Sequence, residues 1–252
     1  MSALALVGML VVAGAAPSEG MARVGPGRIQ PAFQQDRGDG AAGAEIEVPA
    51  FLLDRHPVTN AEFLEFVRRH PEWQRGRVSP LFADERYLAR WASPLDPGPD
   101  APLRAPVTEV SWFAARAYCK SRGARLPTEN EWELAARAGA DEPGFTARIL
   151  AWYAQPTPKV LPEVARGEPN AWGVYDLHGL VWEWVSDFTN ALVSGDSRDP
   201  GDPDRIQFCG AGALALRDKR DYATFMRVAF RSSLEARYSI ANLGFRCARD
   251  LP

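Results

Sequence analysis

The chain has 252 residues, of which 46% are hydrophobic, so it is long enough to bury a sizeable core as a single domain. Its 29 basic and 32 acidic residues nearly balance and form no basic run, which argues against a nucleic-acid partner. Glycine and proline, 21 of each, are spread along the chain and predict many turns and few long regular elements.

The first twenty residues contain an apolar run, LALVGMLVVAGAA, that is followed by PSEG. The run has the length of a signal peptide, so we expect cleavage near residues 13–16 and a single domain over residues 21–252. It is too short for a convincing transmembrane span, and no stable membrane span is expected after cleavage. No Lys or Arg precedes the run, so a misassigned start or a buried strand is the alternative. The pattern favours a periplasmic or secreted protein.

A first helix is predicted just after residue 59. Thr59 followed by Glu62 has the spacing of a capping box, in which each side chain binds a free backbone N–H group. Phe63, Phe66 and Val67 then recur at helical spacing and would form the buried face.

Two more helices are predicted between residues 111 and 139. Ser111 can cap the run WFAARAYCKSR, which Gly123 would end. Thr128 and Glu131 form a second capping box, which opens the run EWELAARA before Gly139.

Strand signals are short and scattered. Residues 45–54, EIEVPAFLLD, show the partial alternation of a strand, and the segments 169–188 and 227–233 are expected to supply others. Residues 189–206 are rich in Ser, Gly, Asp and Pro and predict a surface loop. Because strands and helices do not alternate regularly, the pattern favours an irregular α+β domain over a doubly wound sheet.

Three segments carry a specific resemblance. They are RLPTENEWELAARAG at residues 125–139, PNAWGVYDLHGLVWEWVSDF at residues 169–188 and NLGFRCARD at residues 242–250. In this order they resemble the formylglycine-generating enzyme family, also called the sulfatase-modifying factor domain. The resemblance implies a C-type-lectin-like fold with few short helices and strands and much loop.

Three cysteines occur, at positions 119, 209 and 247, which allows one pair and one leftover thiol. The resemblance implies a disulfide between Cys119 and Cys247, which requires an oxidising compartment. The alternative is a pair of buried thiols that pack as small hydrophobic groups.

The resembled oxidases hold copper with two cysteine thiolates, and this pair is absent here. No cysteine follows Gly210 until Cys247, and Ala215 and Arg220, near the missing positions, are not soft ligands. Copper is therefore not expected. Cys209 is a weak candidate for a reactive thiol, and a buried, unreactive cysteine is the alternative.

The histidines His56, His70 and His178 are too scattered to predict a metal triad. Iron-dependent sulfoxide synthases that contain a similar domain take their histidine ligands from a separate helical domain, which this chain lacks. A role for iron is left open.

The resemblance implies one calcium site in the Trp-rich segment. Its ligands would be the side chains of Asp176 and Glu183 and the backbone carbonyls of Gly179 and Val181, which are the oxygen donors that calcium requires. Alternatively, the two carboxylates accept backbone N–H groups and organise the turn without a metal.

The resemblance also places Trp182 and Asn242 beside a peptide groove. The alternative for Trp182 is that it fills an irregular core, as buried aromatic residues usually do. Arg246 is expected to anchor the C-terminal strand through its several donors and not to bind substrate.

Three functions remain open. The first is an exported maturation or accessory factor that recognises a peptide segment or the cofactor of another exported protein. The second is an oxidoreductase, of the formylglycine-generating type or another metal- and oxygen-dependent kind. The third is a non-catalytic ligand-binding module, because fold alone does not fix function.

Overall fold

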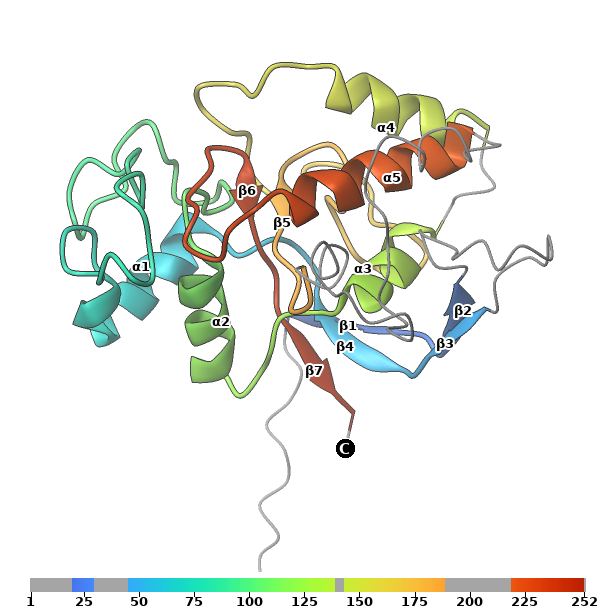
Figure 1. The fold of residues 1–252 in the computed structure, drawn as a ribbon, viewed down its shortest axis with the longest axis horizontal. Helices are drawn as coiled ribbons and strands as arrows, with labels where there is room; N and C mark the ends of the chain where they lie inside the picture. Colours follow the sequence, from blue (N-terminus) through green and yellow to red (C-terminus); the bar gives the residue numbers. More distant parts are fainter. Residues whose placement is uncertain (1–19, 30–44, 139–142, 189–218, 252) are drawn as a thin grey trace, which may run out of the picture.

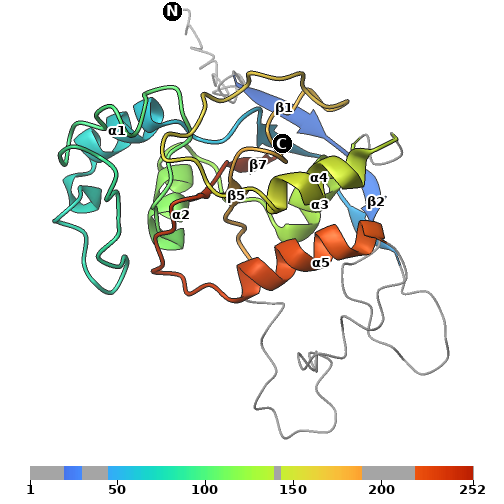
Figure 2. The same cartoon turned by 90° about the horizontal axis from the view of Figure 1, so that it is seen from above.

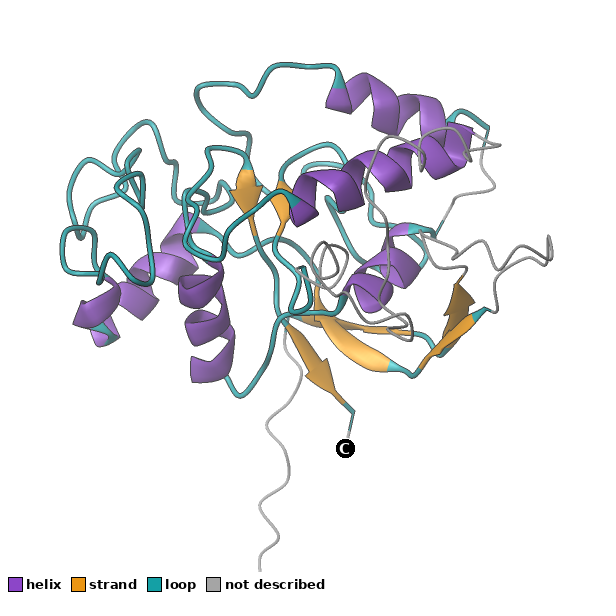
Figure 3. Ribbon diagram, in the orientation of Figure 1, coloured by secondary structure: helices purple, strands orange, loops and turns teal. Residues whose placement is uncertain are grey.

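The computed structural model of the chain describes residues 20–29, 45–138, 143–188 and 219–251. These residues form short helices and strands joined by long loops, which confirms the irregular α+β architecture (Figures 1 and 3). Residues 1–19 of the predicted signal peptide and the predicted loop 189–206 lie outside the described residues.

The largest sheet joins the two ends of the described chain. Its order is β1 (Met21–Val24), β4 (Phe51–Asp54) and β7 (Ala248–Asp250), and the central strand β4 is antiparallel to both neighbours. A second antiparallel pair consists of β2 (Gly27–Ile29) and β3 (Ile46–Val48).

The prediction of a single strand over residues 45–54 is wrong. The segment divides into β3 and β4, which belong to different sheets. Pro49 lies at the break, and it has no N–H group to donate to a ladder.

The three cap-based helix predictions are confirmed. The helices are α1 (Asn60–Arg69), α2 (Trp112–Ser121) and α3 (Glu129–Ala136), and a short 3₁₀ turn, η1 (Pro71–Trp73), follows α1. Thr59 and Thr128 each form a complete capping box, and the Ser111 side chain accepts the N–H of Ala114. After α2 the chain turns at Gly123, whose φ of 64° favours glycine.

An aromatic cluster fills the core between α1, α2 and the C-terminal segment. The ring of Phe63 lies 5.3 Å from that of Phe66 and 5.8 Å from that of Tyr118. Tyr118 in turn meets Phe245 edge-on at 5.3 Å. Phe63, Phe66 and Phe245 are almost fully buried, as the helical spacing predicted for the first two.

Two helices were not predicted, α4 (Phe145–Tyr153) and α5 (Lys219–Ser232), which lie side by side (Figures 1 and 2). The strand predicted at residues 227–233 is therefore wrong, because this segment is the end of α5. The buried positions Ala223, Arg227 and Arg231 recur every four residues, which is helical spacing. Two of them are arginines, so the buried face does not look apolar in the sequence.

Among the described residues, none of the helices combines the length and the apolar character that crossing a bilayer requires.

Candidate functional site

Two short strands bring the predicted groove residues together. Strands β5 (Trp182–Glu183) and β6 (Leu243–Gly244) are parallel, and the Trp182 N–H donates to the Asn242 carbonyl at 2.8 Å. Gly244 fixes this pair against a neighbouring loop, because a Cβ there would lie 2.7 Å from the Val107 carbonyl oxygen. Trp182 and Asn242 are both partly exposed and lie side by side, and their role in a peptide groove stays a prediction.

Trp182 is the centre of an aromatic cluster at this surface. Its ring stacks on that of Tyr153 at 4.7 Å with 26° between the planes, and Trp152 lies 5.4 Å away. Phe230 of α5 contacts it at 4.7 Å. Trp182 therefore contacts three rings and is also partly exposed, so it combines features of both predicted roles.

A buried layer of charges links α5 to α3 beneath the aromatic cluster. Arg231 pairs with Glu129, and Arg227 pairs with Glu133. Both guanidinium groups lie over the ring of Trp132, at 4.5 Å for Arg231 and 4.7 Å for Arg227. All five side chains are mostly or fully buried. Helix α5 is therefore held by ion pairs and cation–π contacts that are shielded from water.

The pKa values in this layer reflect burial and neighbouring charge. Burial lowers the pKa of Arg227 to about 10, although Glu129 opposes this effect. Burial alone would raise the pKa of Glu129, but Arg231 and Arg227 outweigh it and hold the pKa below its usual range. Glu129 is therefore an anion at neutral pH.

Glu183 and Arg246 form a second buried pair, in which neither side chain is exposed. Arg246 donates from Nε and Nη2 to the carboxylate, with a shortest distance of 2.7 Å, and the Trp132 indole N–H donates to it at 2.7 Å. Arg246 also donates to the carbonyls of Asp54 and Tyr175. These contacts fit the predicted role of Arg246 as an anchor of the C-terminal strand.

The side chains predicted to hold calcium do not fit such a site as they lie. Both oxygens of Glu183 are engaged by Arg246 and Trp132, so a cation would have to displace Arg246. Asp176 accepts the Ala165 N–H at 2.6 Å, and burial raises the pKa of its carboxyl. Within the described ranges, no group of three or more His, Cys, Asp or Glu side chains is placed to hold a metal. Calcium binding stays a prediction, and no step below depends on it.

His178 is neutral and structural in character. Its ring meets Trp132 edge-on at 5.5 Å and Phe145 edge-on at 5.6 Å. Burial is the main reason that its pKa falls to about 4, with added repulsion from Arg231 and Arg246.

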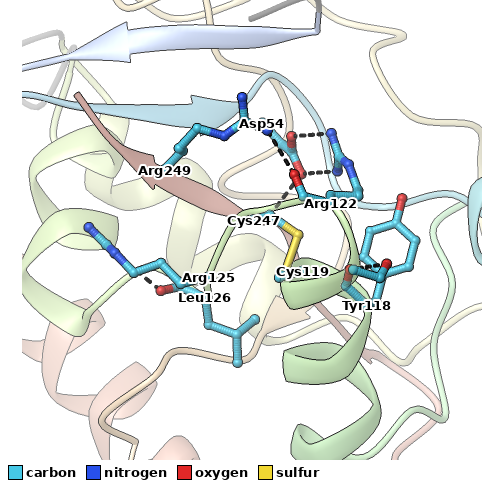
Figure 4. Close-up of a disulfide and its surroundings, with 9 residues drawn as sticks. Asp54, Tyr118, Cys119, Arg122, Arg125, Leu126, Cys247 and Arg249 are labelled. Carbon is cyan, nitrogen blue, oxygen red and sulfur yellow. Dashed lines mark hydrogen bonds and ion pairs between the residues drawn. A yellow bond between two sulfur atoms is a disulfide. The ribbon is translucent and has the colours of Figure 1, made fainter. Parts of the chain in front are cut away.

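The predicted disulfide is present, and both of its cysteines are fully buried (Figure 4). Cys119 of α2 and Cys247 are bonded, with 5.5 Å between their Cα atoms. Asp54 accepts the Cys247 N–H at 2.9 Å and forms a two-pronged ion pair with Arg122. Burial raises the pKa of Asp54 even though Arg122 opposes the shift.

Cys209 and Ala215 lie outside the described residues, so the structure does not place the candidate reactive thiol. Arg220 belongs to the first turn of α5. The part of α5 that meets the aromatic cluster presents Phe230 and Arg231, neither of which is a soft metal ligand.

A hollow beside Asn60 has room for about one water molecule. It is lined by Asn60, Arg90, Trp91, Asp100, Ala101, Pro102, Ala105, Pro106, Thr108 and Leu161. The Asn60 amide is already satisfied by the Trp91 indole and by the carbonyls of Pro102 and Ala105. This hollow is too small to be a ligand site.

Sequence reasoning missed the partners of Trp182. Tyr153 and Trp152 end a helix without a cap signal, and Phe230 belongs to the helix predicted as a strand. One signal was available: Glu129 and Glu133 are four residues apart, as are Arg227 and Arg231. Side chains four residues apart lie on the same face of a helix, so the two acids mark one face of α3 and the two arginines one face of α5.

Comparison with known proteins identifies the family. The sulfatase-modifying factor enzyme 1-like domain matches residues 10–251. The chain belongs to this family, which includes the formylglycine-generating enzymes.

Several curated relatives match most of the chain. A formylglycine-generating enzyme of Streptomyces coelicolor is 35% identical, over 81% of this chain and 80% of its own. That of Thermomonospora curvata is 30% identical, over 96% and 93%. A Bos taurus protein named inactive C-alpha-formylglycine-generating enzyme 2 is 32% identical, over 90% and 87%. Among solved structures, PvdO from Pseudomonas aeruginosa is 20% identical with a TM-score of 0.47 and covers 92% of both chains.

Proposed function

We propose that this protein is an exported accessory factor of the formylglycine-generating enzyme family, which binds a peptide segment or the cofactor of another exported protein. The observation that carries the proposal is the meeting of Trp182 and Asn242 across the β5–β6 pair, at a partly exposed aromatic surface. Aromatic rings beside polar backbone groups suit an extended peptide, because rings bury large area and carbonyls accept N–H groups.

The absence of a thiolate pair supports binding over oxidation. Between Gly210 and Cys247 the sequence has no cysteine, so Cu(I) would lack the two soft ligands that hold it in the resembled oxidases. The relative that is named inactive shows that the family contains members so described. A protein of this kind retains the scaffold and its surface and loses the oxidation.

The proposed location is the periplasm or the extracellular space. The apolar N-terminal run and the Cys119–Cys247 bond both suit an oxidising compartment.

The function is tested by locating the partner at the site. A photoreactive phenylalanine analogue in place of Ala241, beside Asn242, would be used to crosslink the exported proteins of the cell, and the crosslinked peptide would then be synthesised. We expect that peptide to bind the unmodified protein and to lose at least tenfold in affinity to Trp182→Ala. Phe82→Ala, an exposed aromatic elsewhere, is the matched control and should bind like the unmodified protein. Equal affinity in all three proteins would refute the proposed site.

The same protein separates accessory factor from oxidase. Supplied with copper, oxygen and a CxPxR peptide, it should give no aldehyde by mass spectrometry. Turnover that survives Cys209→Ser would establish the oxidase function instead.

A further inference from the structure

The ring of Tyr153 covers one face of Trp182. It stacks on Trp182 at 4.7 Å, nearly parallel, and its hydroxyl donates to the carbonyl of Ala223 at 3.3 Å. Building on the proposed function, we infer that the Tyr153 ring in the free protein occupies a ligand-binding space between Trp182 and Phe230 on one side and the end of α4 on the other. We call this space the aromatic slot. A ligand ring that bears one neutral O–H or N–H donor takes its place when the site is occupied.

One side of the slot is fixed. Trp182 is held by the β5–β6 hydrogen bonds, and Phe230 is held by α5. Helix α5 is anchored by the buried pairs of Arg227 and Arg231 with α3, and Arg231 Nε donates to the Glu183 carbonyl, next to Trp182. Moving α5 would separate the buried ion pairs of Arg227 and Arg231, so this side of the slot stays in place.

The other side is lightly held. Helix α4 has nine residues, starts at Gly144 without a side-chain hydrogen bond, and has one buried residue, Ile149. A helix this short is marginal in water without tertiary packing. Residues 154–160, which follow it, are all exposed. The hydroxyl bond of Tyr153 is longer than the usual length of about 2.7–2.8 Å for O–H donors. The last turn of α4 is held to the Trp182 cluster by the rings of Trp152 and Tyr153 and to α5 by this one long hydroxyl bond, so it can lift when a ligand replaces these contacts.

The surroundings define the chemistry of the replacing group. Stacking on Trp182 and contact with Phe230 select a planar, apolar ring. Burial raises the pKa of the Tyr153 hydroxyl, so the slot disfavours an anion. The Ala223 carbonyl, once released by Tyr153, accepts one donor. Indole and phenol rings meet these conditions, either as a peptide side chain or as a free aromatic molecule.

Calorimetric titration with three probes tests the inference: Ac-Gly-Trp-Gly-NH2, Ac-Gly-Leu-Gly-NH2 and free indole. Tyr153→Ala should bind the Trp peptide about two- to tenfold tighter than the unmodified protein, the range that one stacked pair supports. The Leu peptide should show no gain. Trp182→Ala should lose the gain, and Phe82→Ala should behave like the unmodified protein. A Trp peptide that binds more tightly than indole identifies a peptide side chain as the ligand, and the reverse identifies a free aromatic molecule.

Tyr153→Phe covers the case in which the alanine variant does not fold. It keeps the ring and removes the hydroxyl bond, so hydrogen exchange in the last turn of α4 should accelerate while that of α5 stays unchanged. Exchange and Trp-peptide affinity equal to those of the unmodified protein would overturn the inference. So would a Tyr153→Ala variant that melts normally and gains no affinity. If Trp182→Ala still loses the crosslinked partner peptide in that case, the proposed function stands and only the self-filled slot is rejected.

Discussion

Glu183 is the residue whose role separates a metal site from an ion-pair site. Its carboxylate faces Arg246 and Trp132, with no exposed surface. Glu183→Gln would leave the Arg246 charge buried and unpaired, so the free energy of unfolding should fall by about 3–5 kcal/mol. Urea unfolding in calcium and in chelator measures this loss, which should be the same in both.

The control for this change is Glu163→Gln, at an exposed pair with Arg104. It should alter the free energy of unfolding by less than about 0.5 kcal/mol. If calcium raises the melting temperature of the unmodified protein but not of Glu183→Gln, Glu183 is a calcium ligand and the ion-pair assignment is wrong.

His178 makes stability depend on pH. Its pKa is about 4 in the folded protein, against 6.5 ordinarily, so only the unfolded chain takes up a proton between these values. Its contribution is complete above pH 6.5 and falls as the pH drops toward 4, by about 3 kcal/mol in total. His178→Gln should remove this dependence, as measured by urea unfolding at pH 7 and pH 4.5.

Other groups change stability in the opposite direction. Burial raises the pKa values of Asp54, Asp176 and Asp187, so the folded chain binds protons at these carboxyls more readily than the unfolded chain. Their contribution to the free energy of unfolding therefore rises as the pH falls. Subtracting the His178→Gln curve from that of the unmodified protein cancels them. His70→Gln, at a half-exposed histidine, is the control for the same change of residue type. An unchanged slope in His178→Gln would contradict the assignment.

At this scale the sequence identified residues better than their partners. Trp182 and Asn242 lie side by side, and Arg246 bonds to Glu183 and to the carbonyls of Asp54 and Tyr175, whereas their role in a groove stays a prediction. The resemblance implied a calcium ion beside Glu183, and the structure places the Arg246 guanidinium against that carboxylate. The sequence shows that a carboxylate is present, but its partner comes from a residue far away in the sequence and is seen only in the folded structure.

At the scale of elements, the pairing of α3 with α5 is the feature that supports the site. Glu129→Leu leaves Arg231 buried without its ion-pair partner and should lower the free energy of unfolding by about 3–5 kcal/mol. Arg231→Met leaves Glu129 with Arg227 as its remaining partner, so its loss should be smaller. The double variant removes both charges, and its loss should be smaller than the sum by about 1–3 kcal/mol. Urea unfolding of the four proteins measures the coupling. Strictly additive losses would show that the two side chains do not interact.

The helices that were predicted and those that were missed differ in how they start. Helices α1, α2 and α3 each begin with a hydroxyl residue whose side chain binds a free N–H group, and that local signal is readable. Helix α4 begins at Gly144 without such a bond. Helix α5 buries Arg227 and Arg231, so the face that meets the carboxylates of α3 does not look apolar in the sequence.

At the scale of the molecule, family membership and chemistry separate. The scaffold segments are retained over almost the whole chain, whereas the thiolate pair that holds copper in the resembled enzymes is missing. The predicted disulfide, which depends on the scaffold, is present. The sequence therefore predicts the architecture more completely than the reaction, because a fold depends on many distributed contacts and a metal site on a few ligands.

The Cys119–Cys247 bond joins α2 to the C-terminal strand region across 128 residues of sequence. A loop of that length, closed in the unfolded chain, corresponds to about 5 kcal/mol of stabilisation in the chain-entropy model, which is an upper value for this bond. The double variant Cys119→Ala/Cys247→Ala should therefore lose up to that much free energy of unfolding, and its urea unfolding midpoint should fall. Because the sequence has three cysteines, the unfolded, unreduced protein should react with one equivalent of iodoacetamide, at Cys209. Peptide mapping without reductant identifies the bonded pair directly, and a bond from Cys209 to either of the other two would overturn the assignment.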